Sequence, residues 1–156
     1  MSTHQPGPPA LPVTFRPGRT RVVLLCVGTV MFTVISAVGL TLDRLSAGER
    51  ASFVVTAGLF LFVLYLLARP KVVADEDGVT VVNITRVRRL AWAEILRVNL
   101  RPGDPWVYLD LSDGTSLPAL GIQPGIAQSK AVADARALRA LAESRSNPSR
   151  STPGTA

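Results

Sequence analysis

Two long apolar runs dominate the first half of the chain. Residues 22–42 and 51–68 contain no charged side chain, whereas the loop between them, 43–50, carries two acids and two bases. At about 1.5 Å per helical residue, the runs would be roughly 31 Å and 27 Å long, close to the thickness of the hydrocarbon core of a bilayer. The pattern therefore predicts a transmembrane helical hairpin over residues 21–69, with spans at 22–42 and 51–68.

Short segments of β type replace the apolar runs after Pro70. Strands are expected at 71–74, 79–84, 85–91, 95–101, 106–111 and 116–120, with a brief helical turn at 92–94. Turn residues such as Asp-Gly and Pro-Gly pairs separate them. The strand 95–101 alternates strictly, so we expect Leu96, Val98 and Leu100 to face the core and the residues between them to face water.

A helical pattern closes this segment. Apolar side chains recur at spacings of three and four between Val132 and Ala142, and Ser129 suits the N-cap position. We expect one amphipathic helix here and a soluble domain over residues 70–143. Residues 1–20, which are rich in proline, and residues 144–156, rich in Ser, Pro and Arg, are expected to be disordered tails.

The net charge of +6 suggests a nucleic-acid partner only until the charges are located. Residues 69–143 contain ten basic and nine acidic side chains, so the soluble domain is nearly neutral. Binding to a phosphate backbone requires clustered Lys and Arg. We therefore expect no nucleic-acid partner, and we interpret the basic residues near the apolar runs as topology signals.

Basic residues are more frequent beside the outer ends of the two apolar runs than in the loop that joins the runs. Three arginines precede the first run, two basic residues follow the second, and two lie in the loop: Arg16, Arg19 and Arg21; Arg69 and Lys71; Arg44 and Arg50. The positive-inside rule then predicts an inner-membrane, multi-pass protein with cytoplasmic N- and C-termini. A cleaved signal peptide is the alternative for the first run, but its length and the second run favour two retained helices.

Three short elements carry a family resemblance. They are Gly78 in the turn before the second expected strand, Trp92, Glu94 and Ile95 after the third, and the Asp113-Gly114 hairpin. With the hairpins and the closing helix, residues 20–143 resemble the bacterial PH-domain family typified by the low-molecular-weight protein antigen of high-GC Gram-positive bacteria. The resemblance implies an α+β fold: a two-helix transmembrane hairpin followed by a PH-like, partly open antiparallel β-barrel with one C-terminal helix. It implies no reaction.

The first candidate site, for a protein partner, is the solvent-facing side of the 95–111 hairpin. Its side chains are those of Arg97, Asn99, Arg101, Trp106 and Tyr108. A turn centred on residues 103 and 104 would place Arg97 opposite Asp110, Asn99 opposite Tyr108, and Arg101 opposite Trp106. Aromatic residues beside arginines are typical of interfaces. A purely structural role is favoured, because cross-strand charge pairs and cation-π contacts stabilise any small sheet.

A second candidate, for lipid contact, consists of Arg86, Arg88 and Arg89. Held near an anionic leaflet, each arginine would be attracted to the lipid by about 1 kcal/mol. The structural alternative is a charged strand edge that resists aggregation. We favour that alternative, because the hairpin already provides the membrane address.

No pattern of catalytic residues is present in the soluble domain. It has no His or Cys, and it lacks HExxH, P-loop and GxSxG motifs. We therefore expect a non-enzymatic, membrane-anchored PH-like module that presents a cytoplasmic protein-interaction surface, with no cofactor, metal or small-molecule substrate. An anionic-lipid-sensing domain and a structural subunit of a membrane complex are the alternatives. The bilayer and an unidentified protein are the expected partners.

Overall fold

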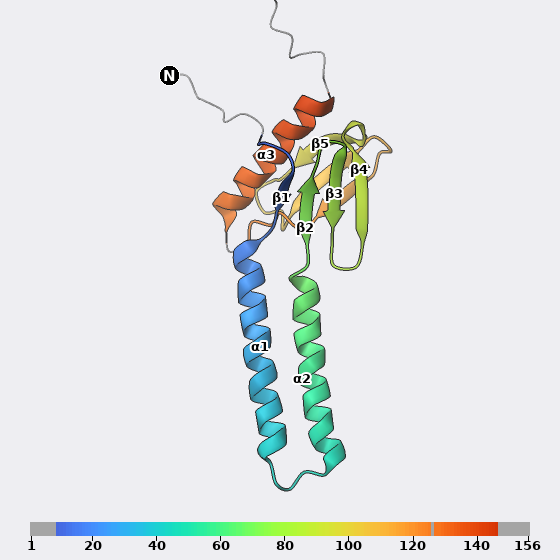
Figure 1. The fold of residues 1–156 in the computed structure, drawn as a ribbon. Helices are drawn as coiled ribbons and strands as arrows, with labels where there is room; N and C mark the ends of the chain where they lie inside the picture. Colours follow the sequence, from blue (N-terminus) through green and yellow to red (C-terminus); the bar gives the residue numbers. More distant parts are fainter. Residues whose placement is uncertain (1–8, 126, 147–156) are drawn as a thin grey trace, which may run out of the picture.

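The structure, a computed structural model, describes residues 9–125 and 127–146. Two long helices, α1 (Gly18–Thr41) and α2 (Ala47–Leu67), lie side by side and antiparallel (Figure 1). A β-rich domain lies at the end where α1 begins and α2 ends (Figure 1). Of the expected disordered tails, residues 1–8 and 147–156 lie outside the described residues.

Both helices are long and apolar enough to cross a membrane. Their outward side chains are exposed: Val55 is 69% exposed and Leu59 is 61% exposed. A core helix of a soluble protein would bury such side chains. α1 begins four residues before the first apolar run, so Arg19 and Arg21 lie in its first turn.

The two helices approach each other closely at small residues. A Cβ atom added at Gly39 would lie only 2.4 Å from the Cβ of Phe53, so glycine is what allows this contact. At the far end, a capping box begins α2. The backbone N–H of Ser46 donates to Glu49 Oε2 over 2.8 Å, and the backbone N–H of Glu49 donates to Ser46 Oγ over 3.4 Å.

Within the described residues, the domain contains two antiparallel sheets. The first has the strand order β1-β2-β3-β4 and consists of β1 (Val13–Phe15), β2 (Lys71–Ala74), β3 (Gly78–Val82) and β4 (Val87–Ala91). A 3-10 turn, η1 (Trp92–Glu94), leads into the second sheet. That sheet has the order β5-β6-β7 and consists of β5 (Ile95–Asn99), β6 (Val107–Leu111) and β7 (Ser116–Ala119).

The sequence did not reveal β1, which lies inside the segment expected to be a disordered tail over 1–20. Val13 pairs with Ala74, Thr14 with Val73, and Phe15 with Val72. The Phe15 side chain is only 4% exposed and belongs to the core of the domain. The expectation of disorder was therefore wrong for this part of the tail, because pairing with β2 satisfies its backbone and burial stabilises its aromatic ring. The helical hairpin is thus inserted between the first two strands of the domain.

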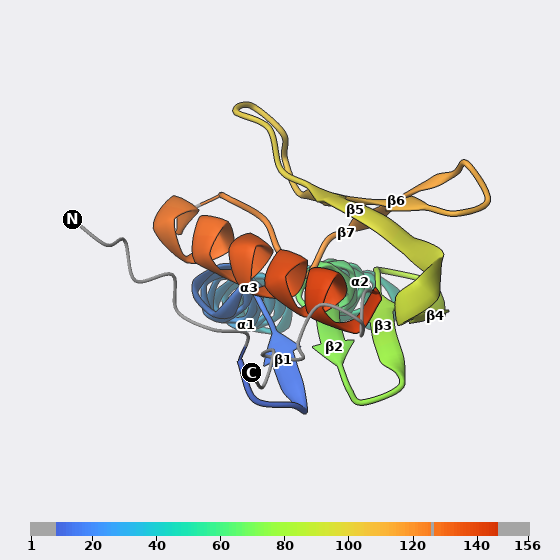
Figure 2. The same cartoon turned by 90° about the horizontal axis from the view of Figure 1, so that it is seen from above.

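The remaining strands and the C-terminal helix, α3 (Gln128–Ser146), agree with the sequence prediction to within three residues at each end. Seen from above, α3 crosses the opening between the two sheets (Figure 2). Its inner face buries Ala131, Ala135, Leu138, Leu141 and Ala142. Burying side chains of this size is worth roughly 1.5–3 kcal/mol for each leucine. The helix therefore completes one core shared by both sheets.

Two contacts hold the edges of the sheets together. The Asn83 side chain, after β3, donates to Pro118 O over 2.8 Å and accepts from the Leu120 N–H over 3.1 Å. Next to it, Gly121 lies against the backbone of Lys71, where an added Cβ would come within 2.6 Å of the Lys71 Cα. These contacts close one side of the barrel.

One expected side-chain direction is wrong. Leu96 is 69% exposed rather than facing the core. The register between β5 and β6 shifts between Ile95 and Arg97, which leaves Leu96 as the extra residue of a bulge. Ile95 therefore occupies the core position next to Leu111, and the strict alternation begins only at Arg97.

The expected fold class is confirmed. The chain is α+β, with two long apolar helices, antiparallel sheets in a PH-like arrangement and a C-terminal helix. One feature of the expected order differs, because the helical hairpin lies within the domain rather than entirely before it.

Candidate functional site

The outer face of the β5-β6 hairpin brings together most of the residues expected there. The register confirms that Arg97 lies opposite Asp110 and Asn99 opposite Tyr108. Arg101 and Trp106 lie beyond the paired residues, at the base of the loop that joins the two strands. This face and its neighbouring loop are called the hairpin face below.

The expected charge pair on this face does not form. Asp110 instead accepts hydrogen bonds from the Asn99 amide and, over 3.0 Å, from the Ser116 hydroxyl. The Arg97 and Arg101 side chains are exposed. Among the described residues, neither makes an ion pair or stacks on an aromatic ring. Two cations on this face are therefore available to an external group.

The two aromatic residues contact each other. The ring centroids of Trp106 and Tyr108 are 6.4 Å apart, and the ring planes are inclined by 52°. Both side chains are half-buried. The Trp106 indole N–H is buried and meets no acceptor within the described part of the chain. What Trp106 offers to the surface is therefore mainly apolar ring area.

A groove adjoins the hairpin face and was not foreseen from the sequence. It has a volume of about 370 Å³ and lies between β5 and α3, where Leu96, Arg97, Asn99, Arg139 and Glu143 line it. Arg139 donates from Nε and Nη2 to Val98 O, over 3.2 and 2.7 Å. The arginine thereby ties α3 to the edge strand. The bulge places Leu96 at this groove. The regular alternation of apolar and polar residues over 95–101 did not indicate the bulge.

Two of the three arginines of the lipid-contact candidate form ion pairs with neighbouring acidic residues. Arg88 pairs with Asp113 over 3.4 Å, and Arg89 pairs with Asp75 over 3.3 Å and with Asp77 over 3.4 Å. Arg86, in contrast, makes no ion pair among the described residues. Two of the three side chains are therefore held by carboxylates of the domain, and both lie on β4, the edge strand of the first sheet.

The Asp113 carboxylate is also held by its own turn. Its Oδ1 accepts from the Thr115 hydroxyl over 2.6 Å and from the Thr115 backbone N–H over 2.8 Å. These two hydrogen bonds lower the pKa of Asp113 from its ordinary value, and Arg88 lowers the pKa further. Asp113 is therefore a stably ionised partner for Arg88.

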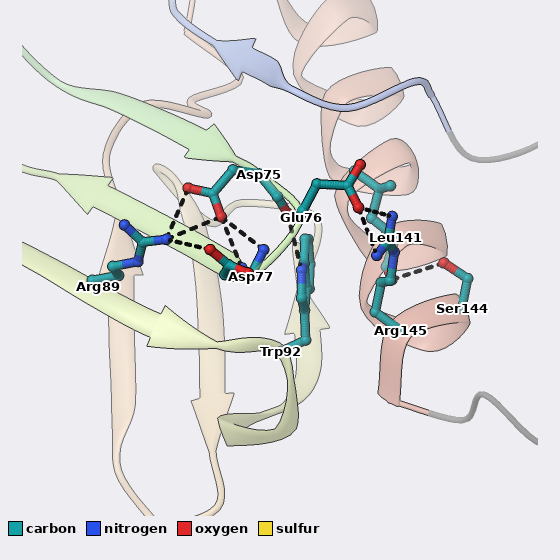
Figure 3. Close-up of polar contacts among 9 residues, drawn as sticks. Asp75, Glu76, Asp77, Arg89, Trp92, Leu141, Ser144 and Arg145 are labelled. Carbon is teal, nitrogen blue, oxygen red and sulfur yellow. Dashed lines mark hydrogen bonds and ion pairs between the residues drawn. The ribbon is translucent and has the colours of Figure 1, made fainter.

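The acidic turn between β2 and β3 has a structural role (Figure 3). Asp75 Oδ1 accepts from the backbone N–H groups of Asp77 and Gly78 over 3.0 and 2.9 Å, and Asp75 O accepts from the indole N–H of the buried Trp92 over 3.1 Å. Glu76 binds Arg145 of α3 over 3.3 Å (Figure 3). The turn thus joins the first sheet to η1 and to the C-terminal helix.

Comparison with known proteins agrees with this geometry. Residues 69–141 match the family described as bacterial PH domain. The chain is also 32% identical, over 101 residues, to uncharacterized proteins of Mycobacterium bovis and Mycobacterium tuberculosis. The matched region covers 65% of this chain and 61% of each relative. No solved structure is significantly similar to the chain. The family match begins after α2, so it does not include β1.

Proposed function

Because residues 69–141 match the bacterial PH-domain family, we propose that this chain is a two-span, membrane-anchored member of it, of the low-molecular-weight protein antigen type. In this proposal α1 and α2 anchor the protein in the inner membrane. The PH-like domain then faces the cytoplasm and binds another protein without catalysing a reaction. The length, apolar character and outward exposure of the two helices support the anchoring role.

The free arginines of the hairpin face are the observation that carries the binding role. Arg97 and Arg101 lie beside Trp106 and Tyr108, and they are exposed without an ion pair among the described residues. Elsewhere on the domain, Arg88, Arg89 and Arg145 are each held by a carboxylate. Arginine and aromatic residues are enriched where interfaces gain most of their binding energy. A partner segment that carries carboxylates would complement this face.

The groove between β5 and α3 extends the same surface. The exposed Leu96 side chain provides an apolar contact there, next to Arg97. An exposed leucine next to an unpaired arginine favours an acidic segment that also contains an apolar side chain. The proposed partner is therefore an acidic protein segment rather than a nucleic acid.

Site-specific crosslinking in native membranes tests this proposal. A photoreactive amino acid at Tyr108 should capture a discrete protein partner, whereas the same group at Ala133, exposed on α3, should not. The double variant Arg97→Glu, Arg101→Glu should then reduce capture at Tyr108 by about tenfold, since buried interfacial charge pairs are worth 1.5 kcal/mol or more. Arg136→Glu is the matched control, because Arg136 is an exposed arginine on α3.

The outcomes separate this role from the alternatives. Equal capture at Tyr108 and Ala133, or capture unaffected by the double variant, would contradict binding at the hairpin face. Lipid sensing by Arg86, Arg88 and Arg89 is not favoured, because two of these three arginines have carboxylate partners. A structural subunit of a membrane complex would give capture through α1 or α2 instead.

A further inference from the structure

A second basic cluster lies where the helices join the domain. A cavity of about 250 Å³ is lined there by four basic side chains from four neighbouring stretches of chain: Arg16 after β1, Arg21 in α1, Arg69 after α2 and Lys71 at the start of β2. Leu25, Tyr65 and Ala68 form its apolar wall. We call this the junction cavity.

Among the described residues, no carboxylate lines the junction cavity. Within the described residues, none of its four cations forms an ion pair. Four like charges around one cavity repel one another, and a bound anion would relieve that repulsion, most strongly where lipid replaces the screening water. The junction cavity therefore favours an anionic ligand, in contrast to the acid-paired arginines of β4.

The position of the junction cavity restricts the kind of anion. It lies directly at the ends of the apolar parts of both helices, with Arg21 next to the first apolar residue, Val22, and Tyr65 in the last turn of α2. In an inserted hairpin this level corresponds to the lipid headgroups, where tyrosine and arginine are enriched. The cationic rim would face the headgroup layer, and the wall of Leu25 and Tyr65 would face the start of the acyl chains.

We propose that the junction cavity binds the phosphate of an anionic phospholipid, with Arg16, Arg21, Arg69 and Lys71 as its ligands. Basic pockets at the cytoplasmic ends of membrane helices bind anionic headgroups in this way. Guanidinium groups can donate two hydrogen bonds to one phosphate, so the three arginines provide geometric selectivity as well as charge. This inference rests on the anchoring part of the proposed function, but not on the protein partner.

Lipid competition on the full-length protein tests the proposal. The purified chain, in a neutral detergent, is equilibrated with equimolar phosphatidylglycerol and phosphatidylcholine, and bound lipids are counted by native mass spectrometry. Phosphatidylglycerol should be retained preferentially. The double variant Arg69→Gln, Lys71→Gln should reduce that preference about tenfold, since each basic residue near the surface contributes several-fold to anionic-lipid binding.

Matched variants distinguish a site from general charge. Arg86→Gln with Arg88→Gln removes the same charge, from the residue just before β4 and from β4 itself, and should leave the preference unchanged. Arg16→Gln, outside both helices, is a milder junction variant that serves if the first one does not fold. Inorganic phosphate is added in a separate arm and should not displace the lipid.

Each contrary outcome overturns the proposal. These outcomes are no preference for phosphatidylglycerol in the wild type, an equal loss in the β4 control, and displacement of the lipid by inorganic phosphate. The last of them would identify a free-phosphate site. Incorporation of the protein into lipid nanodiscs is measured in parallel. Failure to insert would contradict the anchoring role, whereas insertion without lipid preference would contradict only the junction site.

Discussion

Phe15, which precedes the helical hairpin, pairs across the sheet with Val72, which follows it. Phe15→Ala should therefore destabilise the domain by about 3–5 kcal/mol, the usual cost of removing a buried phenylalanine ring. Denaturation of the full chain in detergent, followed by tryptophan fluorescence, measures the change. Thr14→Ala is the control, because Thr14 lies on the same strand but is exposed. Equal stability of the two variants would mean that β1 is dispensable.

The contact between Gly39 and Phe53 predicts a sensitive position in the hairpin. Gly39→Ala should reduce the stability of the helix pair by about 1–3 kcal/mol, because the added methyl group would overpack the contact. Thermal unfolding in micelles provides the measurement. Gly58→Ala is the matched control, since its added Cβ would meet only the Phe32 ring at 4.0 Å. A similar loss in both variants would attribute the effect to something other than this contact.

Arg139 predicts how firmly α3 is docked. Arg139→Gln should lower stability by about 1 kcal/mol, below the roughly 1.5–3 kcal/mol usual for a hydrogen bond to a charged group, because the side chain is exposed. The same variant should show faster amide hydrogen exchange in β5 and α3. Arg136→Gln, three residues away on the same helix and exposed, should change neither quantity. If Arg139→Gln left exchange in β5 unchanged, its bonds to Val98 would not hold the helix.

The hydrogen bonds from Thr115 predict the titration of Asp113. Thr115→Val removes the hydroxyl donor, so the pKa of Asp113 should rise toward its ordinary value. Arg88→Gln should raise the pKa less, since the Thr115 hydroxyl has the larger effect. NMR titration of the side-chain carboxyl measures both shifts. Because the folded pKa is depressed, this stabilisation is present above the unfolded pKa and is lost as the pH falls through the folded value. A larger rise in the Asp113 pKa in Arg88→Gln than in Thr115→Val would show that Arg88, and not the Thr115 hydroxyl, has the larger effect.

The proposed topology can be tested with single cysteines. Cys26 is the only native cysteine, so Cys26→Ser gives a cysteine-free background. In intact cells an impermeant maleimide should label Asp43→Cys, in the loop between the helices, but not Ser112→Cys, in the β6-β7 turn. Labelling of both should appear after the membrane is permeabilised. The reverse pattern in intact cells would place the domain outside the cell.

Much of the domain follows from local sequence signals. The turns at Asp77-Gly78, Pro102-Gly103 and Asp113-Gly114 are short-range features, and together with the short β-type segments between them they located six strands. β1 is different, because three residues give too short a period to recognise, and its partner lies beyond two helices. A strand stabilised mainly by a distant partner leaves little trace in its own sequence.

The candidate site was predictable in position but not in contacts. The strand register alone placed Arg97 opposite Asp110. The Asp110 carboxylate nevertheless accepts hydrogen bonds from Asn99 and Ser116, and which side chains reach it cannot be predicted from the register. The bulge at Leu96 was hidden for a similar reason. Ile95 and Leu96 are both apolar, so either could have filled the core position. The ion pairs of Arg88 and Arg89 on β4 could not be predicted either. Their acidic partners come from two other turns of the domain, the β2-β3 turn and the β6-β7 turn.

The insertion of the hairpin between β1 and β2 gives the domain two attachments to the helix pair. Only Arg16 and Pro17 separate β1 from α1, and three residues separate α2 from β2. A domain on a single linker can swivel about it, whereas neighbouring strands fixed to two packed helices cannot turn independently of them. A tilt of the helix pair, or a change in bilayer thickness, would therefore be transmitted to the sheet as a change in orientation of the whole domain.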